Sequence, residues 1–111
     1  MIVDSTITNI SDSDSEPEDF RVHQNFPNPF GKSSVSGAEN TTIVFELSKP
    51  EKVGMIVYNS IGERVQSFKK KEYSPGRRQF VLGAANLPSG IYFYVIETSE
   101  SQIAKKIVLL K

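Results

Sequence analysis

An antiparallel all-β fold is what this sequence predicts, and three features indicate it. Short apolar runs rich in β-branched and aromatic residues show the two-residue alternation of strands that bury one face. Gly, Pro, Asn and Ser gather between the runs, at positions that turns favour. Six or seven such runs recur about every 10 to 15 residues, and no window has helical periodicity. This regular spacing is typical of an immunoglobulin-like β-sandwich of about seven strands.

The most strand-like run covers residues 91–96, which read IYFYVI. Six aromatic or β-branched residues without a polar interruption predict a central strand that is covered on both faces. A type I turn is expected just before it, with Pro88 at the second position and Gly90 at the fourth. We therefore expect the other strands to be neighbours or covering layers of this one.

The chain before this run supplies the other strands in order. Pro27 and Pro29 cannot donate to a ladder, so residues 20–30 are expected at an edge or as a wrap, anchored by Phe26 and Phe30. A Gly- and Ser-rich surface loop should follow. It is expected over residues 31–40, with strands over residues 41–47, 53–58, 64–70, 77–82 and, after the central run, 102–110.

Two further turns set the phase of the middle strands. Asn59 and Gly62 fit the first and fourth positions of a type I turn, so residues 53–70 should form a hairpin. Pro75 and Gly76 fit the central positions of a type II turn. The predicted core then consists of Ile43, Phe45, Met55, Val57, Val65, Phe80, Leu82, Ile91, Phe93, Val95 and Ile107. On this prediction, replacing Phe93 by Ala should cost about 3 to 5 kcal/mol.

Charge is divided unevenly, although the chain of 111 residues is neutral as a whole. Residues 1–19 carry six acids and no base, whereas residues 20–111 carry thirteen bases and seven acids, which gives −6 and +6. A Ser- and acid-rich segment with few apolar groups cannot offset its ordering entropy. Residues 1–19 are therefore predicted to be a flexible linker and residues 20–111 the folded domain. Alternatively, an edge strand or the end of a preceding domain could include Ile2, Val3, Ile7 and Ile10.

Composition excludes several classes of protein. Without cysteine, neither a disulfide framework nor a thiolate metal site can be proposed. The longest apolar runs are far shorter than the ~20 residues that a membrane-spanning helix needs. Residues 1–10 lack the basic start and continuous apolar segment of a signal peptide, so an export signal would have to lie on a longer parent protein.

The candidate chemical sites are weak. His23 is the only histidine and has polar neighbours, so we expect it to be exposed or hydrogen-bonded and not catalytic. Asp12, Asp14 and Glu16 imitate the start of a calcium loop, but its sixth and twelfth places hold Pro17 and His23 instead of Gly and Glu. No enzyme, cofactor or metal site is predicted.

A basic cluster surrounds the predicted turn at Gly76. Clustered cations beside an aromatic ring can bind phosphate or nucleic acid, with steep salt dependence. Cations are also common on edge strands, where they discourage strand addition, and we interpret the cluster as such a solvated edge. Its members are Lys69, Lys70, Lys71, Tyr73, Arg77 and Arg78.

Three motifs occur in a fixed order: QNFPNPF at residues 24–30, VYNSIGERV at 57–65, and NLPSGIYFYVI at 86–96 followed by KKIVLLK at 105–111. Together they resemble the C-terminal sorting domain, type A, of proteins exported by type IX secretion in Bacteroidetes and related bacteria. The resemblance covers about residues 20–111. It has two departures, because residues 31–40 look inserted and Arg78 stands where relatives often have His.

The resemblance implies a non-enzymatic targeting module at the end of a secreted protein. Such a sandwich directs its cargo from the periplasm through the outer-membrane translocon, and a surface sortase usually removes it as the cargo is attached to the cell surface. The implied partners are translocon, shuttle and sortase proteins and a cargo domain in the same polypeptide, with no cofactor, nucleic acid or membrane insertion. The acidic linker would be the accessible site of cleavage.

By position, the family's recognition strand corresponds to the last eight residues: Ala104, Lys105, Lys106, Ile107, Val108, Leu109, Leu110 and Lys111. The family's Gly-containing turns correspond to Gly62, Gly76 and Gly90, the last preceded by Pro88. A terminal strand at a sheet edge can offer its backbone for strand addition, while alternate side chains give selectivity.

A function of a different class stays open. An accessory β-sandwich of an extracellular enzyme could bind carbohydrate or protein, with Tyr73, Tyr92 or Tyr94 as an exposed aromatic platform.

Overall fold

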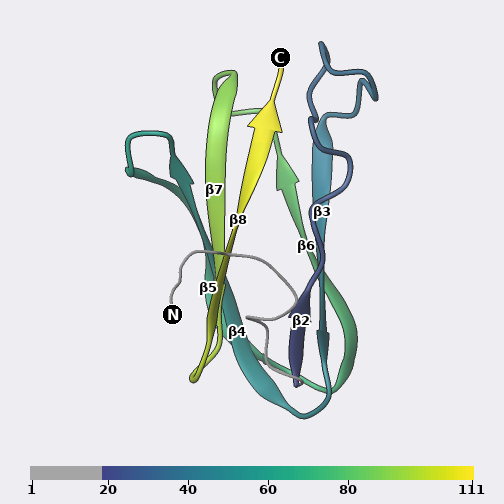
Figure 1. Ribbon diagram of the computed structural model, residues 1–111, viewed down its shortest axis with the longest axis vertical. Helices are drawn as coiled ribbons and strands as arrows, with labels where there is room; N and C mark the ends of the chain where they lie inside the picture. Colours follow the sequence, from purple (N-terminus) through teal and green to yellow (C-terminus); the bar gives the residue numbers. More distant parts are fainter. Residues whose placement is uncertain (1–18) are drawn as a thin grey trace, which may run out of the picture.

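Two antiparallel sheets pack face to face in the computed structural model, which describes residues 19–111 (Figure 1). One sheet has the strand order β2-β3-β6 and the other the order β5-β4-β7-β8. Between residues 19 and 111 there are seven strands, which confirms the predicted all-β sandwich. This part of the chain contains no helix long and apolar enough to cross a membrane.

The strands match the predicted runs within a few residues at each end. Their bounds are Phe20–Val22 (β2), Asn40–Leu47 (β3), Glu51–Asn59 (β4), Arg64–Tyr73 (β5), Gly76–Gly83 (β6), Gly90–Glu97 (β7) and Gln102–Leu109 (β8).

The predicted turns connect these strands in two ways. β4 and β5 form the expected hairpin, and the amide of Gly62 donates to the carbonyl of Asn59 at 3.0 Å in its turn. β5 and β6 are joined by Ser74 and Pro75 but belong to different sheets. The turn at Gly76, whose φ is +128°, therefore carries the chain from one layer of the sandwich to the other.

The start of the described chain is fixed to the three-stranded sheet. Asp19 accepts a hydrogen bond from the hydroxyl of Ser48 at 2.8 Å and lies 3.5 Å from the ammonium of Lys49. The rest of the predicted linker lies outside the described residues. So do the apolar residues Ile2, Val3, Ile7 and Ile10 and the calcium-like acids Asp12, Asp14 and Glu16.

The core lies between the sheets, and most of the predicted core side chains fill it. Val65 is only partly buried and packs at the margin of the core. Three aromatic rings pack together at one end of the core. The ring centroids of Phe45 and Phe80 are 5.2 Å apart in a stacked arrangement, and Tyr73 lies edge-on to Phe45 with 5.4 Å between the centroids. The predicted residues that are buried are Ile43, Phe45, Met55, Val57, Phe80, Leu82 and Ile107.

The predicted phase of β7 is wrong. Tyr92, Tyr94 and Ile96 point into the core, whereas Ile91 and Phe93 are 44% and 39% exposed on the outer face. Val95 also lies on this outer face and is only half-buried. β7 is central in its sheet, as predicted, but the described part of the chain covers only one of its faces. The large cost expected for Phe93→Ala therefore no longer follows.

Strand pairing explains this phase. All the side chains of the run are apolar, so it has no alternation that could show which face is buried. Its neighbour β8 does alternate: Tyr92 lies opposite the buried Ile107, and Phe93 lies opposite the exposed Lys106. Residues directly opposite each other share a face of the sheet, so β8 sets the phase of β7.

Candidate functional site

The C-terminal strand β8 lies at an edge of the four-stranded sheet, where its one strand partner in the described chain is β7. Its side chains alternate between the two faces. Ile107 and Leu109 are fully buried in the core, whereas Ala104 and Lys106 are exposed on the outer face. The strand is thus anchored by its apolar side chains and presents the others outward.

A second segment covers the upper part of this edge, and we call residues 24–33 the strap (Figure 1). At its centre, the amide of Phe30 donates to the carbonyl of Val108 at 3.0 Å, and the amide of Leu110 donates to the carbonyl of Phe30 at 2.8 Å. The amide of Val108 donates to the side-chain oxygen of Asn28 at 2.9 Å. The strap thus pairs with β8 in a short parallel bridge.

The ends of the strap extend this contact. The side chain of Gln24 donates to the carbonyl of Lys106 at 2.9 Å. At the other end, the amide of Ser33 donates to the carbonyl of Leu110 at 2.9 Å, and its hydroxyl to the carbonyl of Lys111 at 2.7 Å. From the carbonyl of Lys106 to that of Lys111, the outer backbone edge is therefore already hydrogen-bonded.

An open edge is left only at the beginning of β8. Between residues 19 and 111, no strand pairs with the outer backbone groups of Gln102 and Ala104. At the β8 edge of the folded domain, a partner can therefore add a strand only beside this lower part. The residues that follow offer side chains to a partner, because their backbone is engaged by the strap and by β7.

Phe30 is the apolar anchor of the strap. Its ring is fully buried, and the two X-Pro bonds around it in the strap, at Pro27 and Pro29, are cis. Phe26 was predicted to be a second anchor, which is wrong, because 79% of it is exposed. The strap crosses from one sheet to the other, and only one of its two rings points into the space between them.

A buried polar network holds the strap to the three-stranded sheet. Asn25 is 2% exposed and Thr41 is fully buried. The side-chain Nδ2 of Asn25 donates to the hydroxyl of Thr41 at 2.8 Å, and this hydroxyl donates to the carbonyl of Pro27 at 2.7 Å. The buried polar atoms are satisfied by one another, so the network fixes the path of the strap without a large desolvation cost.

Gly31 is required where the strap meets the C-terminal residues. Its φ is +110°, and a Cβ built on it would lie 2.2 Å from the carbonyl oxygen of Leu110. Any other residue would clash with backbone at this point. Sequence reasoning placed Gly31 at the start of a surface loop and missed this role. The available signal was a glycine directly after an aromatic residue in a proline-stiffened segment.

The turn before β7 meets the same end of the molecule. The hydroxyl of Tyr92 donates to the carbonyl of Pro88, and the hydroxyl of Ser89 accepts a hydrogen bond from the amide of Lys111 at 2.8 Å. The paired residue of Gly90 in β8 is Leu109. The structure thus brings Pro88 and Gly90 together with the C-terminal residues.

The other two predicted turns differ in position. Gly62 lies near the Pro88 turn, because both turns line one hollow of about 310 Å³. Gly76 pairs with Leu47, at the opposite end of the three-stranded sheet from Asn40 and Gly83. The turn at Gly76 thus lies at the other end of β6 from the segment that leads to the Pro88 turn.

No catalytic arrangement was expected at His23, and its contacts are structural. Its Nε2 lies 2.7 Å from a carboxylate oxygen of Glu46, which also pairs with Arg77 at 3.2 Å. The hydrogen bond with His23, together with the charges of His23 and nearby arginines, lowers the pKa of Glu46. Among residues 19–111, no group of three His, Asp or Glu side chains could hold a metal ion.

The family model for the secretion system C-terminal sorting domain matches residues 24–110, from the start of the strap to the end of β8. The chain belongs to this family. The sorting domain has a targeting role in type IX secretion, so the chain interacts with that machinery and is exported from the cell. The family is not one of enzymes. No curated protein matches the chain.

The first and the third of the three sequence motifs of the sorting domain contact each other in the structure. QNFPNPF forms the strap, and KKIVLLK forms the strand that the strap covers. The segment NLPSGIYFYVI supplies β7 on the other side of that strand, with the turn that holds Lys111. The conformation of the C-terminal residues thus depends on both neighbours.

Proposed function

We propose that the recognition element of this sorting domain is formed by residues 104–111 in the conformation that β7 and the strap impose. The observation that carries the proposal is the double hydrogen bonding of the strand, by β7 on one side and the strap on the other. A strand fixed in this way presents its side chains at constant positions, so a receptor binds it without first ordering it.

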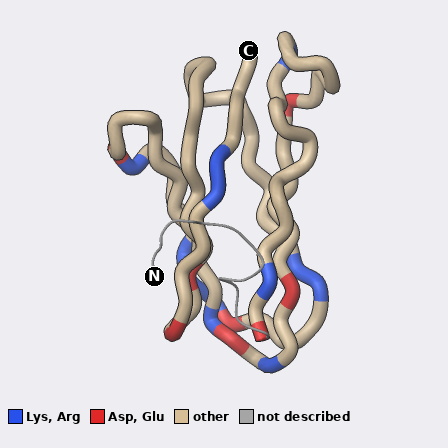
Figure 2. The backbone as a smooth tube through the Cα atoms, viewed as in Figure 1, with Lys and Arg blue, Asp and Glu red and all other residues tan. Residues whose placement is uncertain are grey.

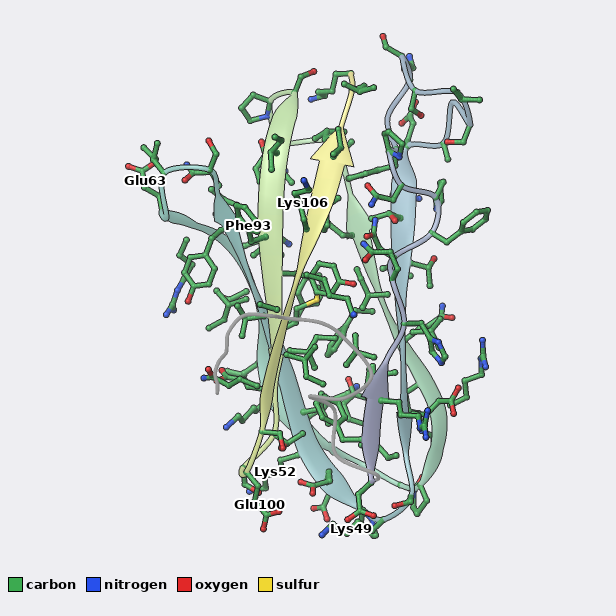
Figure 3. The ribbon with its side chains drawn as sticks, viewed as in Figure 1. Lys49, Lys52, Glu63, Phe93, Glu100 and Lys106 are labelled. Carbon is green, nitrogen blue, oxygen red and sulfur yellow. The ribbon has the colours of Figure 1, made fainter. Side chains whose placement is uncertain are left out.

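Side chains are the features that such a receptor would read. Lys106 and Lys111 are exposed, and Leu110 is 38% exposed beside them. Figure 3 shows Lys106 on the face of the sheet near Phe93. A partner with an acidic rim and an apolar centre would complement this arrangement. Strand addition would be confined to the open edge at Gln102 and Ala104.

The further steps follow the family pattern. The exported protein would reach the outer-membrane translocon through the periplasm, and shuttle and sortase proteins would act on it there. Cleavage in the acidic residues before Asp19 would release the cargo for surface attachment and leave all seven described strands intact. An acidic, Ser-rich stretch in that position is compatible with an accessible cleavage site.

The test is export of a reporter that carries the whole chain at its C-terminus, in a bacterium with an active type IX system. The unmodified fusion should appear outside the cell. Removal of the last five residues should retain it in the periplasm, but this deletion also removes the buried Ile107 and Leu109. The sharper variant therefore replaces only the exposed Lys106, Leu110 and Lys111 by Ala.

A control variant makes the same change of net charge at another place. Lys49 and Lys52 are exposed at the opposite end of the molecule (Figure 3), and their replacement by Ala also removes two positive charges but should leave export unchanged. Purified domains should melt at similar temperatures in all cases. Undiminished export of a folded Lys106, Leu110 and Lys111 variant would reject residues 104–111 as the recognition element.

The alternative function needs exposed aromatic rings as a binding platform, and the three tyrosines considered for it do not provide them. Tyr94 is fully buried and Tyr92 is 4% exposed, so neither can stack on a sugar ring. Tyr73 is only half-buried, but its ring packs against Phe45 and Phe80.

A further inference from the structure

A shallow basic groove runs between the edges of the two sheets, on the side of the sandwich away from the strap. β5 is an edge of the four-stranded sheet and β6 is an edge of the three-stranded sheet. One hollow of about 340 Å³ is lined by Lys69, Lys71 and Phe80, among others. A neighbouring hollow of about 410 Å³ includes Arg78, and Tyr73 and Gln79 line both. The two hollows are thus adjacent along β5 and β6, and we call them together the groove.

Three cations of this groove have no acidic partner within residues 19–111. Lys69 and Lys71 form no ion pair there, and Lys71 lies 5.3 Å from the centre of the Tyr73 ring. Arg78 donates to the carbonyl and hydroxyl of Ser74, which fixes its position but leaves its charge uncompensated. Arg77, by contrast, pairs with Glu46. The groove therefore carries net positive charge close to aromatic side chains.

The burial of the rings argues against nucleic acid or carbohydrate as the ligand. Both classes are usually bound by stacking on an exposed aromatic face. Phe80 is only 6% exposed, and its ring contacts Phe45, Phe68 and Tyr73 at 5.2 to 6.3 Å. Lys71 covers part of Tyr73. The rings form the floor of the groove and offer no stacking platform.

The walls of the groove favour an extended peptide. Both are edge strands, and no strand from residues 19–111 pairs with their outer backbone groups. β5 has a bulge between its pairings with Val53 and Met55, and Lys69 and Lys71, which lie on this stretch, both line the groove. Residues two apart in a strand are separated by about 7 Å, so two such cations match carboxylates on alternate residues of a neighbouring strand.

We propose that this groove binds an extended acidic peptide that carries carboxylates on alternate residues. Lys69 and Lys71 would pair with two successive carboxylates, and Arg78 with a third. Figure 2 shows that most charged positions gather at the end of the molecule opposite the C-terminus, away from the strap. The proposal is independent of the sorting role, because β5 and β8 are opposite edges of their sheet.

The sequence of this chain supplies a suitable probe. Acids stand at every second position from Asp12 to Glu18, within the stretch SDSDSEPED at residues 11–19. A fluorescently labelled peptide of this sequence would be titrated with the full chain, and binding followed by anisotropy. In that chain Asp12, Asp14, Glu16 and Glu18 are replaced by their amides, so that its own acids do not compete. We expect saturable binding that weakens as salt is raised.

Two paired comparisons make the test specific. The double variant Lys69→Gln and Lys71→Gln should weaken binding about tenfold, because the loss of each ion pair should lower the affinity by about threefold. The control variant Lys52→Gln and Lys106→Gln removes the same charge elsewhere and should change affinity less than about twofold. A peptide of the same composition with its acids together, SSSPDDDEE, should bind more weakly than the alternating one, by about fivefold or more.

Three results would overturn the proposal. One is the absence of saturable binding, and another is an equal loss of affinity in both double variants. The third is equally tight binding of heparin or of a single-stranded oligonucleotide of matched charge, with the same sensitivity to the change at Lys69 and Lys71. That result would show a general polyanion patch in place of a peptide site.

Discussion

The strap makes a quantitative prediction, because its two phenylalanines differ in burial. Phe30→Ala removes a fully buried ring from the core and should lower the free energy of unfolding by about 3 to 5 kcal/mol. In a domain of this size, such a loss should lower the melting temperature by roughly 12 °C or more. Phe26→Ala, four residues earlier, changes a ring that is 79% exposed and should cost less than about 0.5 kcal/mol.

Thermal melts followed by circular dichroism measure both variants. If Phe30→Ala proves too unstable to purify, Phe30→Leu keeps most of the apolar volume and should cost about 1.5 kcal/mol. Hydrogen exchange then gives a local readout, since the amides of Val108 and Leu110 donate to the strap and should lose protection in either Phe30 variant. Equal melting temperatures for Phe30→Ala and Phe26→Ala would refute the burial of Phe30 and, with it, the role of the strap as a support for β8.

The remaining predictions concern the phase of β7, the strap glycine and acid stability. Tyr94→Ala should destabilise the domain by about 3 kcal/mol or more and Phe93→Ala by about 1 kcal/mol or less. Urea titration measures both losses, and a larger loss for Phe93→Ala than for Tyr94→Ala would contradict the assigned phase of β7. Gly31→Ala should lower the melting temperature strongly, because its Cβ would clash with the Leu110 carbonyl, whereas Gly37→Ala, with open space around it, should cost much less. The folded-state pKa of Glu46 is lowered, so its contribution to stability is present above its unfolded pKa of about 4.5 and is lost as pH falls through the folded value. The melting temperatures of the native chain and of Glu46→Gln should therefore differ at pH 7, and this difference should narrow as the pH is lowered to 3. A difference that stays constant over this range would show that the Glu46 carboxylate does not contribute to the acid loss of stability.

The motif QNFPNPF, which forms most of the strap, has a structural role beyond turn formation. Its prolines, Asn25 and Phe30 place a short segment across the gap between the sheets, where it bonds to β8. On the proposed function, another protein binds the last residues of the domain, and such binding is favoured when those residues are already ordered. The strap supplies this order where no further strand of the sheet is present in the described chain.

Sequence reasoning predicted the fold well wherever a run alternated. In β3 the residues Ile43, Phe45 and Leu47 alternate with Thr42, Val44 and Glu46, so the buried face follows from this pattern alone. The Asn59 and Gly62 turn followed from local backbone chemistry in the same way. The sandwich itself needed only the spacing of these local signals.

The recognition element at residues 104–111 stays a prediction from the sequence, and its structural surroundings could not be predicted. The order of the motifs pointed to residues 104–111, whereas the cover provided by the strap depends on contacts between residues about 80 positions apart, such as Asn28 and Val108. The groove of Lys69, Lys71 and Arg78 likewise needs two sheet edges to meet. Local patterns carry no information on such pairings.

The sequence by itself thus determined which segments become strands, where the chain turns, and that the C-terminal motif belongs to a sorting domain. Only the tertiary structure decided which face of β7 is buried, which of two phenylalanines anchors the strap, and how much of β8 stays open. The physical reason is that a uniformly apolar strand, or a pair of similar rings, has nearly equal local preferences for either side. The choice is then made by the neighbours against which each side chain packs.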